Sequence, residues 1–213
     1  YDIARRHGLR VIEDAALAIG SSWRGRPIGS FGDLVCFSFH PNKNITSIEG
    51  GALVVNDDTE ARMAERWRFH GIQRLPDGTR DVTEAGGKFN LPDVNARVGV
   101  DQLARLDAFN ARRRELVGRY FERWRAEPTA LLPLRGHAGD EAGHSWNMFA
   151  PLLPLDALTI TRQQFMAAMH ERGIGTGMSY EPLHLTQLAR ARWGGREGQH
   201  PNAERIGRET VTL

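Results

Sequence analysis

The two lysines are the residues of this chain whose chemistry is easiest to isolate. Lys43 and Lys88 are the only lysines among 28 basic residues, and arginine supplies the others. Arginine stays protonated in proteins, whereas a lysine amine can lose its proton and then act as a nucleophile or form a Schiff base. Lys43 is therefore either an ordinary surface cation or an amine kept for covalent chemistry, and its surroundings distinguish the two.

Two polar clusters follow apolar runs in the first fifty residues. Residues 9–12 predict a buried parallel strand that ends at Glu13–Asp14, and residues 34–39 predict a second strand shortly before Lys43. Ligands of open α/β sheets bind at the carboxyl ends of the strands. A carboxylate and an amine held there fit pyridoxal phosphate, whose pyridine nitrogen pairs with an acid and whose aldehyde is carried by a lysine. Ser38, near the end of the second run, is suited to donate to the phosphate.

Each of these residues also has a plainer interpretation. Asp14, at the turn after a strand, suits the N-cap of a helix as well as a cofactor ring. Ser38, taken alone, is simply a polar residue inside a strand. The residues by themselves leave these alternatives open.

Composition argues against several other classes of protein. The chain of 213 residues is 40% hydrophobic and 25% charged, which is typical of a globular protein. No apolar run approaches the ~18 residues of a membrane span, and a net charge of +2 does not favour a nucleic-acid surface. Cys36 is the only cysteine and the histidines lack metal-ligand spacing. We therefore expect no internal disulfide, no metal site and a reducing, cytoplasmic compartment.

The apolar pattern predicts an α/β chain in two parts. We expect a larger domain over residues 1–127 and a smaller α/β domain over residues 128–213, and both ends read as cut points within a longer protein. The expected elements are a hairpin or loop at 21–32, strands at 34–39 and 52–57, a helix at 59–70 with Thr59 as its N-cap, an exposed loop at 73–90, one or two long helices over 93–127, a break at 128–143, a strand at 145–153, a helix over 162–172, a short strand at 173–180 and a further helical stretch.

A resemblance to a known family covers nearly the whole chain. The motifs "VIEDAA" and "GDLVCFSFHPNKNITSIEGGALVVND" are followed in the family's order by "FHGI", "GGKFNLPDVNARVGVDQLARLD" and "ERGIGTGMSYEPLHL". They resemble the DegT/DnrJ/EryC1/StrS family of nucleotide-sugar aminotransferases, which are fold-type I enzymes dependent on pyridoxal 5'-phosphate. The resemblance implies part of a large, mostly parallel sheet domain followed by a smaller C-terminal domain, and a homodimer with a shared active site. The combination of "FSFH", "KFNLPD" and "RGIGTG" most resembles the aminotransferase that makes UDP-4-amino-4-deoxy-L-arabinose.

The resemblance also implies roles for individual residues. Lys43 matches the lysine that forms the Schiff base with the cofactor and shuttles the substrate's α-proton. Asp14 matches the aspartate on the pyridine nitrogen, and Ser38 matches the serine on the phosphate. Lys88 or Asn90 matches the segment that the partner subunit lends to the site. The remaining candidates are Leu17 beside the cofactor ring and, for the substrate, His40, Tyr180 and His184, with a packed tyrosine and a capping histidine as the alternatives for the last two.

The implied activity is transfer of an amino group from glutamate, which leaves as 2-oxoglutarate, to a UDP- or dTDP-linked keto-sugar for polysaccharide or lipopolysaccharide synthesis. Two positions depart from the family pattern. Leu17 replaces a glutamine or histidine at the cofactor ring, and Ser179 replaces a histidine before Tyr180. Leu17 favours one alternative, a non-catalytic regulatory or assembly member of the family. The other alternative is an inactive fragment, because family members are longer and supply further phosphate contacts.

Overall fold

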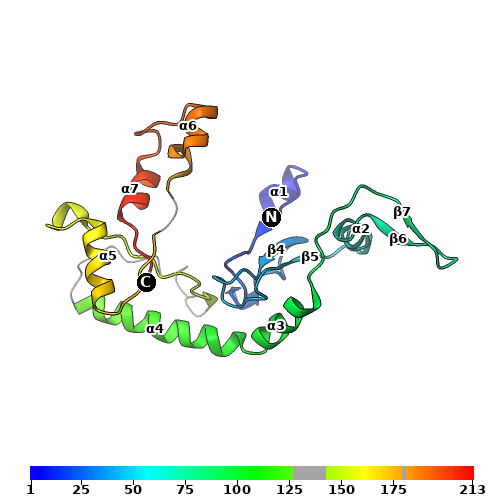
Figure 1. The fold of residues 1–213 in the computed structure, drawn as a ribbon, viewed down its shortest axis with the longest axis horizontal. Helices are drawn as coiled ribbons and strands as arrows, with labels where there is room; N and C mark the ends of the chain where they lie inside the picture. The colour runs from blue at the N-terminus through cyan, green and yellow to red at the C-terminus, as the bar shows by residue number, and fades with distance from the viewer. Residues whose placement is uncertain (127–142, 179–180) are drawn as a thin grey trace. The chain divides into compact units, whose positions relative to one another are not determined.

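Two compact units make up the described part of the chain. The computed structural model describes residues 1–126, 143–178 and 181–213 (Figure 1). The first unit holds residues 1–114 and 143–147, and the second holds residues 115–126 and 148–213 apart from 179–180. No helix within these described ranges is long and apolar enough to cross a membrane. The division of the protein into domains at residue 127 stays a prediction.

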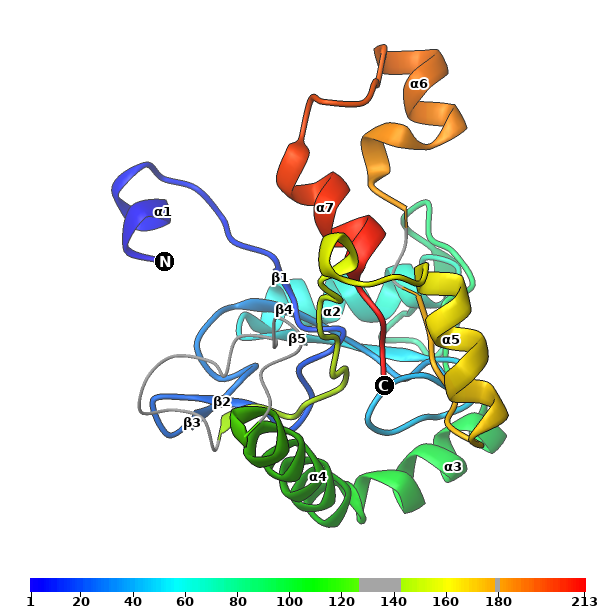
Figure 2. The same cartoon turned by 90° about the vertical axis from the view of Figure 1, so that its left-hand side faces the viewer.

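The first unit is built on a three-stranded sheet. Its strand order is β1 (Glu13–Asp14), β4 (Leu34–Ser38) and β5 (Gly51–Val55), and Figure 2 shows these strands side by side. β1 runs parallel to β4, whereas β5 runs antiparallel to it. Successive side chains of a strand point to opposite faces, and Val35 of β4 is completely buried. The predicted strands at 34–39 and 52–57 are thus confirmed.

The first strand begins later than the sequence pattern predicts. Residues 9–12 lie outside β1, and the side chains of Leu9 and Ile12 are 63% and 70% exposed. Pairing with β4 begins at Glu13 and Asp14, and the backbone N–H of Ala15 donates to the carbonyl of Cys36 at 2.9 Å. An apolar run forms a buried strand where neighbouring backbone pairs with it and other elements cover it. The described residues supply neither at 9–12, so the predicted strand is wrong for this part of the chain.

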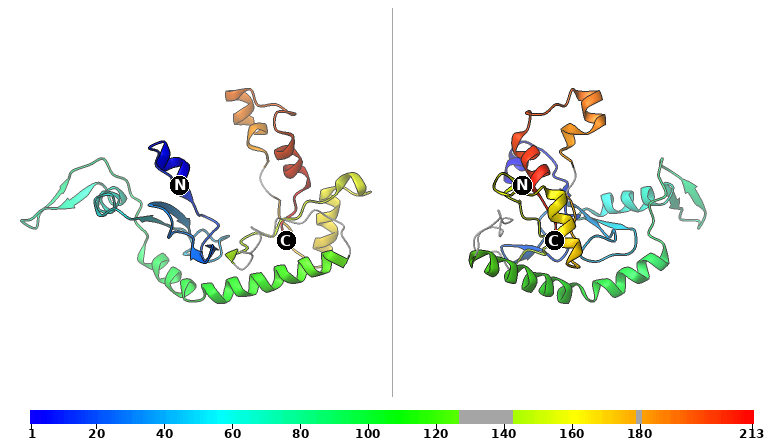
Figure 3. Two further views of the ribbon diagram at one scale, coloured as in Figure 1. Left: turned by 180° about the vertical axis from the view of Figure 1, so that it is seen from behind. Right: turned by 60° about the vertical axis from the view of Figure 1, so that its left-hand side comes forward.

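Two hairpins extend the first unit. β2 (Ser22–Trp23) pairs antiparallel with β3 (Arg26–Pro27), as the glycine- and proline-rich sequence predicts. β6 (Ile72–Arg74) pairs antiparallel with β7 (Arg80–Val82), and this hairpin stands apart from the sheet in Figure 3. The polar composition of 73–90 predicts a loop there, and that prediction is wrong over the hairpin. Because the two strands are mostly exposed, they lack the apolar alternation that identifies a strand.

The helix that follows β5 is capped by an aspartate. α2 spans Asp58–Arg68, and its N-cap is Asp57, whose side chain accepts a hydrogen bond from the backbone N–H of Glu60 at 2.8 Å. A carboxylate at this position satisfies a free N–H and faces the positive end of the helix dipole. Thr59 therefore lies within the first turn, and its predicted role as the N-cap is wrong. A shorter helix, α1 (Asp2–Arg6), precedes the sheet.

Two consecutive helices, α3 (Asp93–Leu103) and α4 (Leu106–Ala126), confirm the prediction of long helices in this region. α4 begins in the first unit and continues in the second. Asn110 of α4 is 2% exposed, whereas Val94 and Val100 of α3 are 72% and 59% exposed. α3 therefore presents apolar side chains that the described residues leave exposed.

The second unit contains helices and little regular sheet. α5 (Arg162–Glu171) confirms the predicted helix, and Thr161 and Gln164 form a reciprocal capping box at its start. Tyr120 of α4 stacks on Phe149, with ring centroids 4.8 Å apart. The remaining elements are η2 (Leu155–Ala157), η3 (Leu183–Leu185), α6 (Gln187–Trp193) and α7 (Pro201–Glu209).

Both strands predicted for the C-terminal part are reduced to single antiparallel bridges. The bridged pairs are Leu152 with Thr210 and Gly177 with Thr212. Val211, which lies between the two bridges, is completely buried. The backbone N–H groups of Leu153, Val211 and Leu213 also donate to the carbonyls of Glu209, Pro151 and Phe149, but these segments do not form a regular pair of strands. The predictions at 145–153 and 173–180 are therefore wrong as regular strands, with 179–180 outside the described residues.

A buried carboxylate joins η3 to the turn before α7. Glu204 accepts hydrogen bonds from the backbone N–H groups of Gly198 at 2.9 Å and His200 at 3.2 Å, and from His184 Nε2 at 2.9 Å. The His184 ring also packs edge-on against His200, with centroids 4.7 Å apart. These donors favour the charged carboxylate, above all the Gly198 N–H, and they lower the pKa of Glu204 to about 2.

Removing the α2 cap is expected to destabilise the protein. Asp57→Ala leaves the Glu60 N–H without its side-chain acceptor, which costs about 1 kcal/mol of unfolding free energy. Thr59→Ala is the matched control, because the Thr59 hydroxyl accepts only an exposed contact from Arg62 at 3.3 Å. Urea denaturation measures both variants. A larger loss for Thr59→Ala than for Asp57→Ala contradicts the assignment of the cap.

Glu204 is expected to make stability depend on acid. Its pKa is lower in the folded protein than its ordinary value of 4.5, so its contribution is present above pH 4.5 and is lost as the pH falls towards about 2. Glu204→Gln should therefore flatten the fall in unfolding free energy across that range. Glu197→Gln is the control, because the Glu197 side chain is 81% exposed and lies 3.7 Å from Arg190. Equal acid dependence in Glu204→Gln and the unsubstituted protein refutes the prediction.

Candidate active site

The register of β1 and β4 places two candidate residues on one face of the sheet. Asp14 lies opposite Cys36 in the parallel pair, and paired residues of neighbouring strands project to the same face. Ser38 is the second residue after Cys36 on β4, so its side chain projects to that face as well. Asp14 ends β1 and Ser38 ends β4. The carboxyl ends of two parallel strands thus present a carboxylate and a hydroxyl together.

The Asp14 carboxylate is exposed and only partly engaged. Its Oδ1 accepts a hydrogen bond from the backbone N–H of Ala16 at 3.0 Å, which closes a turn. Residues 15–20 form turns and no helix, so the alternative of a helix N-cap is wrong. The second carboxylate oxygen has no hydrogen-bond partner among the described residues.

Ser38 lies where β4 passes into the following loop. Its Oγ accepts a hydrogen bond from the backbone N–H of His40 at 3.4 Å, which leaves the hydroxyl hydrogen free to donate elsewhere. The exposed ring of His40 contacts Asn42 through Nδ1, which lies 2.7 Å from Asn42 Oδ1 and 3.2 Å from the backbone nitrogen of Asn42. Its Nε2 lies 3.9 Å from a carboxylate oxygen of Glu49. The His40 ring therefore lies between Asn42, near the start of the loop, and Glu49, near its end.

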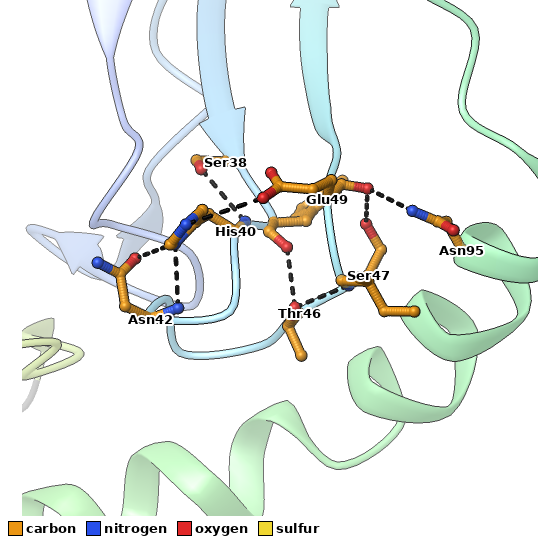
Figure 4. A network of polar contacts seen from close by, with 9 residues as sticks. Ser38, His40, Asn42, Thr46, Ser47, Glu49 and Asn95 are labelled. Atoms are coloured by element: carbon orange, nitrogen blue, oxygen red, sulfur yellow. Dashed lines mark hydrogen bonds and ion pairs between the residues drawn. The ribbon is translucent and has the colours of Figure 1, made fainter.

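The loop of residues 39–50 is held by its own polar side chains (Figure 4). Thr46 Oγ1 donates to the carbonyl of Phe39 at 3.0 Å and accepts from the backbone N–H of Ile48 at 2.8 Å. The backbone N–H of Phe39 donates to the carbonyl of Gly50 at 2.9 Å, which continues the pairing of β4 with β5. These bonds order both arms of the loop near the end of the sheet.

The far arm of the loop is also attached to α3. Ser47 is 1% exposed, and its Oγ donates to the carbonyl of Glu49 at 3.0 Å. Asn95 of α3 donates to the same carbonyl at 3.0 Å, as Figure 4 shows. A carbonyl with two donors is fully satisfied. The first turn of α3 thereby fixes the end of the loop.

Two glycines complete this loop because the backbone passes too close to other atoms for a side chain. A Cβ at Gly51 would lie 2.7 Å from the carbonyl oxygen of Phe37. One at Gly50 would lie 2.8 Å from Leu91 Cδ1, so the segment containing Asn90 passes beside the loop. Gly51 is thus a steric requirement set by backbone, whereas a side chain at Gly50 would have to displace the side chains of Ser47 and Leu91.

Lys43 lies in this loop with an unengaged amine. Its side chain is partly buried, and its backbone N–H donates to the carbonyl of His40 at 3.0 Å. Its ammonium group forms no hydrogen bond or ion pair with the residues that the structure describes. Lys88, in contrast, is engaged: its Nζ lies 4.5 Å from the centroid of the Phe69 ring. Of the two lysines, Lys43 has the amine available for reaction.

Asn90, Lys88 and Leu17, the further candidates for cofactor contact, differ in burial and in hydrogen bonding. Asn90 Oδ1 is buried and accepts no hydrogen bond from any residue that the structure describes. Lys88 and Phe89 beside it are exposed, Phe89 to 77%. Leu17 is 46% exposed, and its backbone carbonyl accepts from Ser145 Oγ at 3.3 Å. Asn90 is thus a buried acceptor that lacks a donor.

The two remaining substrate candidates belong to the C-terminal part of the chain. Tyr180 lies outside the described residues. His184 lies in η3 of the second unit, where its Nε2 is occupied by Glu204. The first unit contains Asp14, Ser38, His40 and Lys43, and the strand register sets Asp14 and Ser38 on one face of its sheet.

Sequence patterns do not identify the residues that hold the lysine loop. Asn44 is 4% exposed and Ser47 is 1% exposed, yet both stand in a polar stretch typical of a surface loop. The contact from Asn95 to Glu49 spans 46 residues. The one local signal is the position of these polar residues between two strands that pair directly with each other.

The donor set fits pyridoxal phosphate. The cofactor needs an uncommitted amine for its aldehyde, a carboxylate for its pyridine nitrogen and hydrogen-bond donors for its phosphate. Lys43, Asp14 and Ser38 offer these groups at the ends of β1 and β4 and in the adjoining loop. The buried, unpartnered Asn90 Oδ1 is a further polar group beside this loop.

Comparisons with known proteins identify the family of the chain. The model of the DegT/DnrJ/EryC1/StrS aminotransferase family matches residues 1–213. The uncharacterised protein MJ1066 of Methanocaldococcus jannaschii is 33% identical over 99% of this chain and 56% of its own length. The chain thus spans about half the length of this curated relative.

Solved structures resemble the chain over its whole length. DesV of S. venezuelae, solved in complex with a ketimine intermediate, is 31% identical with a TM-score of 0.85, and the match covers 100% of this chain and 54% of DesV. DesI, solved in the presence of its TDP-sugar product, is 27% identical with a TM-score of 0.81 over 100% of this chain and 52% of DesI. Solved relatives also include PLP and PMP forms of one sugar aminotransferase. By the match to its full length and by this likeness of structure, the chain belongs to the DegT/DnrJ/EryC1/StrS aminotransferase family.

Proposed function

We propose that the whole protein is a pyridoxal phosphate-dependent aminotransferase that moves an amino group from glutamate to a keto-sugar nucleotide. The observation that carries this proposal is the register of β1 with β4, which puts Asp14 and Ser38 on one face of the sheet. The loop that follows β4 holds Lys43 with an amine that no described residue engages. Family membership supports the reaction class.

Each of the three residues has a distinct task. When bound, pyridoxal phosphate supplies an aldehyde for the incoming amine and a ring that takes up electrons from the carbon being deprotonated. Lys43 Nζ would hold the cofactor through its aldehyde and would move the proton to and from that carbon. The Asp14 carboxylate holds a proton on the ring nitrogen by charge pairing. Ser38 Oγ donates its free hydrogen to the phosphate.

We also propose that the protein is a homodimer in which the second subunit completes each site. Lys88 and Phe89 are exposed, and Asn90 Oδ1 is buried with no donor in the described part of the chain. A group from a second copy would satisfy that oxygen, because buried polar atoms are normally hydrogen-bonded. Lys88 or Asn90 would then reach the phosphate of the neighbouring site, as the family resemblance implies.

The proposed acceptor is a UDP- or dTDP-linked 4-keto sugar, whose aminated product serves polysaccharide or lipopolysaccharide synthesis. The relative DesI, solved with a TDP-sugar product, supports a nucleotide-linked substrate. The motif combination that resembles the UDP-4-amino-4-deoxy-L-arabinose enzyme favours a UDP-linked pentose within this class. His40 is a candidate for the substrate side because its ring is exposed in the loop that carries Lys43. Tyr180 and His184 are candidates through the resemblance alone.

Leu17 favours a second candidate function. A leucine in place of glutamine or histidine can pack on a ring but can neither donate nor accept a hydrogen bond. A non-catalytic family member that acts as a regulatory or assembly partner is the function consistent with that loss. Failure of the full-length protein to bind pyridoxal phosphate while remaining a dimer would support this second function.

Lys43 is expected to carry the cofactor covalently. The full-length protein should be yellow with pyridoxal phosphate, and borohydride should fix the cofactor to the peptide that contains Lys43, as measured by peptide mass. With glutamate and a panel of UDP- and dTDP-linked keto-sugars, one product should have the mass of the aminated sugar. Lys43→Ala and Lys43→Arg should both abolish transfer, because neither side chain can form the Schiff base.

Lys43→Arg is the matched variant, since it keeps the positive charge and most of the volume of the side chain. The thermal transition of each variant shows that it is folded. A folded Lys43→Ala protein that still transaminates would contradict the assignment of Lys43.

A further inference from the structure

The residues on both sides of Lys43 are held by one amide side chain. Asn147 Nδ2 donates to the backbone carbonyl of Asn42 at 3.2 Å and to the side-chain Oδ1 of Asn44 at 2.8 Å. Lys43 lies between these two acceptors in the sequence. The side chain of Asn147 therefore restrains the loop immediately before and after the lysine.

Asn44 extends this restraint into the core of the first unit. Its side chain is 4% exposed, and its Nδ2 donates to Asn110 Oδ1 at 2.7 Å and to the backbone carbonyl of Ser145 at 2.8 Å. Its Oδ1 accepts from Asn147, so both ends of this buried amide are bonded. A buried amide that lost these partners would carry the full penalty of desolvation. We call Asn44, Asn110 and Asn147 the amide cluster.

The amide cluster also bonds to the loop that follows Asp14. Asn110 Nδ2 donates to the carbonyl of Ile19 at 3.4 Å. A Cβ at Gly20 would lie 2.3 Å from Asn110 Nδ2, so only glycine allows that approach. The cluster thus touches both walls of the candidate site: the loop after β1 and the loop that carries Lys43.

Ser145 reinforces the same connection. Its backbone carbonyl accepts from Asn44, and its Oγ donates to the carbonyl of Leu17 at 3.3 Å. Its backbone N–H donates to Ser21 Oγ at 3.1 Å. Ser145 is 1% exposed, so these bonds are shielded from competing water. One buried polar network therefore fixes the spacing between the two loops.

We propose that Asn147 and Asn44 are positioning residues for Lys43, and that the amide cluster sets where the lysine amine lies relative to Asp14. This inference rests on the proposed function. The amide cluster holds the backbone on both sides of the lysine and does not itself provide the amine, the ring carboxylate or the phosphate donor. Its expected effect is therefore on the reaction of Lys43 rather than on the hold of the cofactor. Misplacing a reacting group by about 1 Å can cost on the order of a hundredfold in rate.

Asn147 is the residue to vary, because its side chain is only partly buried and its loss leaves the hydrophobic core intact. Asn147→Ala removes both hydrogen bonds to the lysine loop. Asn147→Asp keeps the size and shape of the side chain but removes its donors. Asn202→Ala is the matched control, because Asn202 is an exposed asparagine of α7 in the second unit.

The experiment uses the full-length protein freed of cofactor. One measurement is the rate at which pyridoxal phosphate becomes fixable to Lys43 by borohydride, read by peptide mass. The other is the equilibrium affinity for pyridoxamine phosphate, which has an amine in place of the aldehyde and so does not react with the lysine. We expect Asn147→Ala and Asn147→Asp to slow attachment by about tenfold to a hundredfold. Pyridoxamine phosphate should bind both variants and Asn202→Ala as it binds the unsubstituted protein.

Three results with the variants and one with the unsubstituted protein would overturn the proposal. Attachment at an unchanged rate in both Asn147 variants removes the positioning role. A fall in pyridoxamine phosphate affinity in step with the attachment rate shows that the whole site has collapsed. An Asn147→Asp variant that behaves as the unsubstituted protein shows that packing matters and hydrogen bonding does not. If the unsubstituted protein itself fixes no cofactor on Lys43, the proposed function fails, and the positioning role fails with it.

Discussion

The parallel pairing of β1 with β4 is the constraint on which the candidate site depends. This short ladder sets Asp14 opposite Cys36, and the alternation of side chains along β4 then sets Ser38 on the same face. A shift of the ladder by one residue would turn one of the two side chains to the buried side, where Val35 lies. The chemistry of the site thus follows from the register of two strands.

The second constraint is the order of the loop between β4 and β5. A reactive lysine on a loose loop would lose much of its advantage, because catalysis requires groups held close to their working geometry. Here the far arm is fixed by Ser47 and Asn95, and the near arm by Asn44 and Asn147. The side-chain amine of Lys43 is engaged by none of the described residues. A rigid backbone with a free amine is the combination that Schiff-base chemistry needs.

The sequence predicts those parts of the fold that depend on local chemistry. Local patterns predict the apolar, β-rich strand that contains Val35, the helix that begins at Arg162 and the reactive context of Lys43. The structure confirms the strand and the helix. The N-cap is predicted two residues away from its true position because Asp57 and Thr59 are both good caps, and only the backbone geometry separates them. The strand predicted at residues 9–12 fails because its burial depends on partners that the described residues do not supply. Sequence patterns do not identify Asn147 as a residue that holds the lysine loop, because its partners lie more than a hundred positions away.

A crystal structure of the full-length protein with pyridoxal phosphate tests the central claim most directly. Two distances decide it: from the Asp14 carboxylate to the pyridine nitrogen, and from Ser38 Oγ to the nearest phosphate oxygen. We expect both distances to lie within hydrogen-bond range, at or below about 3.2 Å, in a site that also contains Lys43. A cofactor bound elsewhere, or a ring nitrogen that faces away from Asp14, would contradict it.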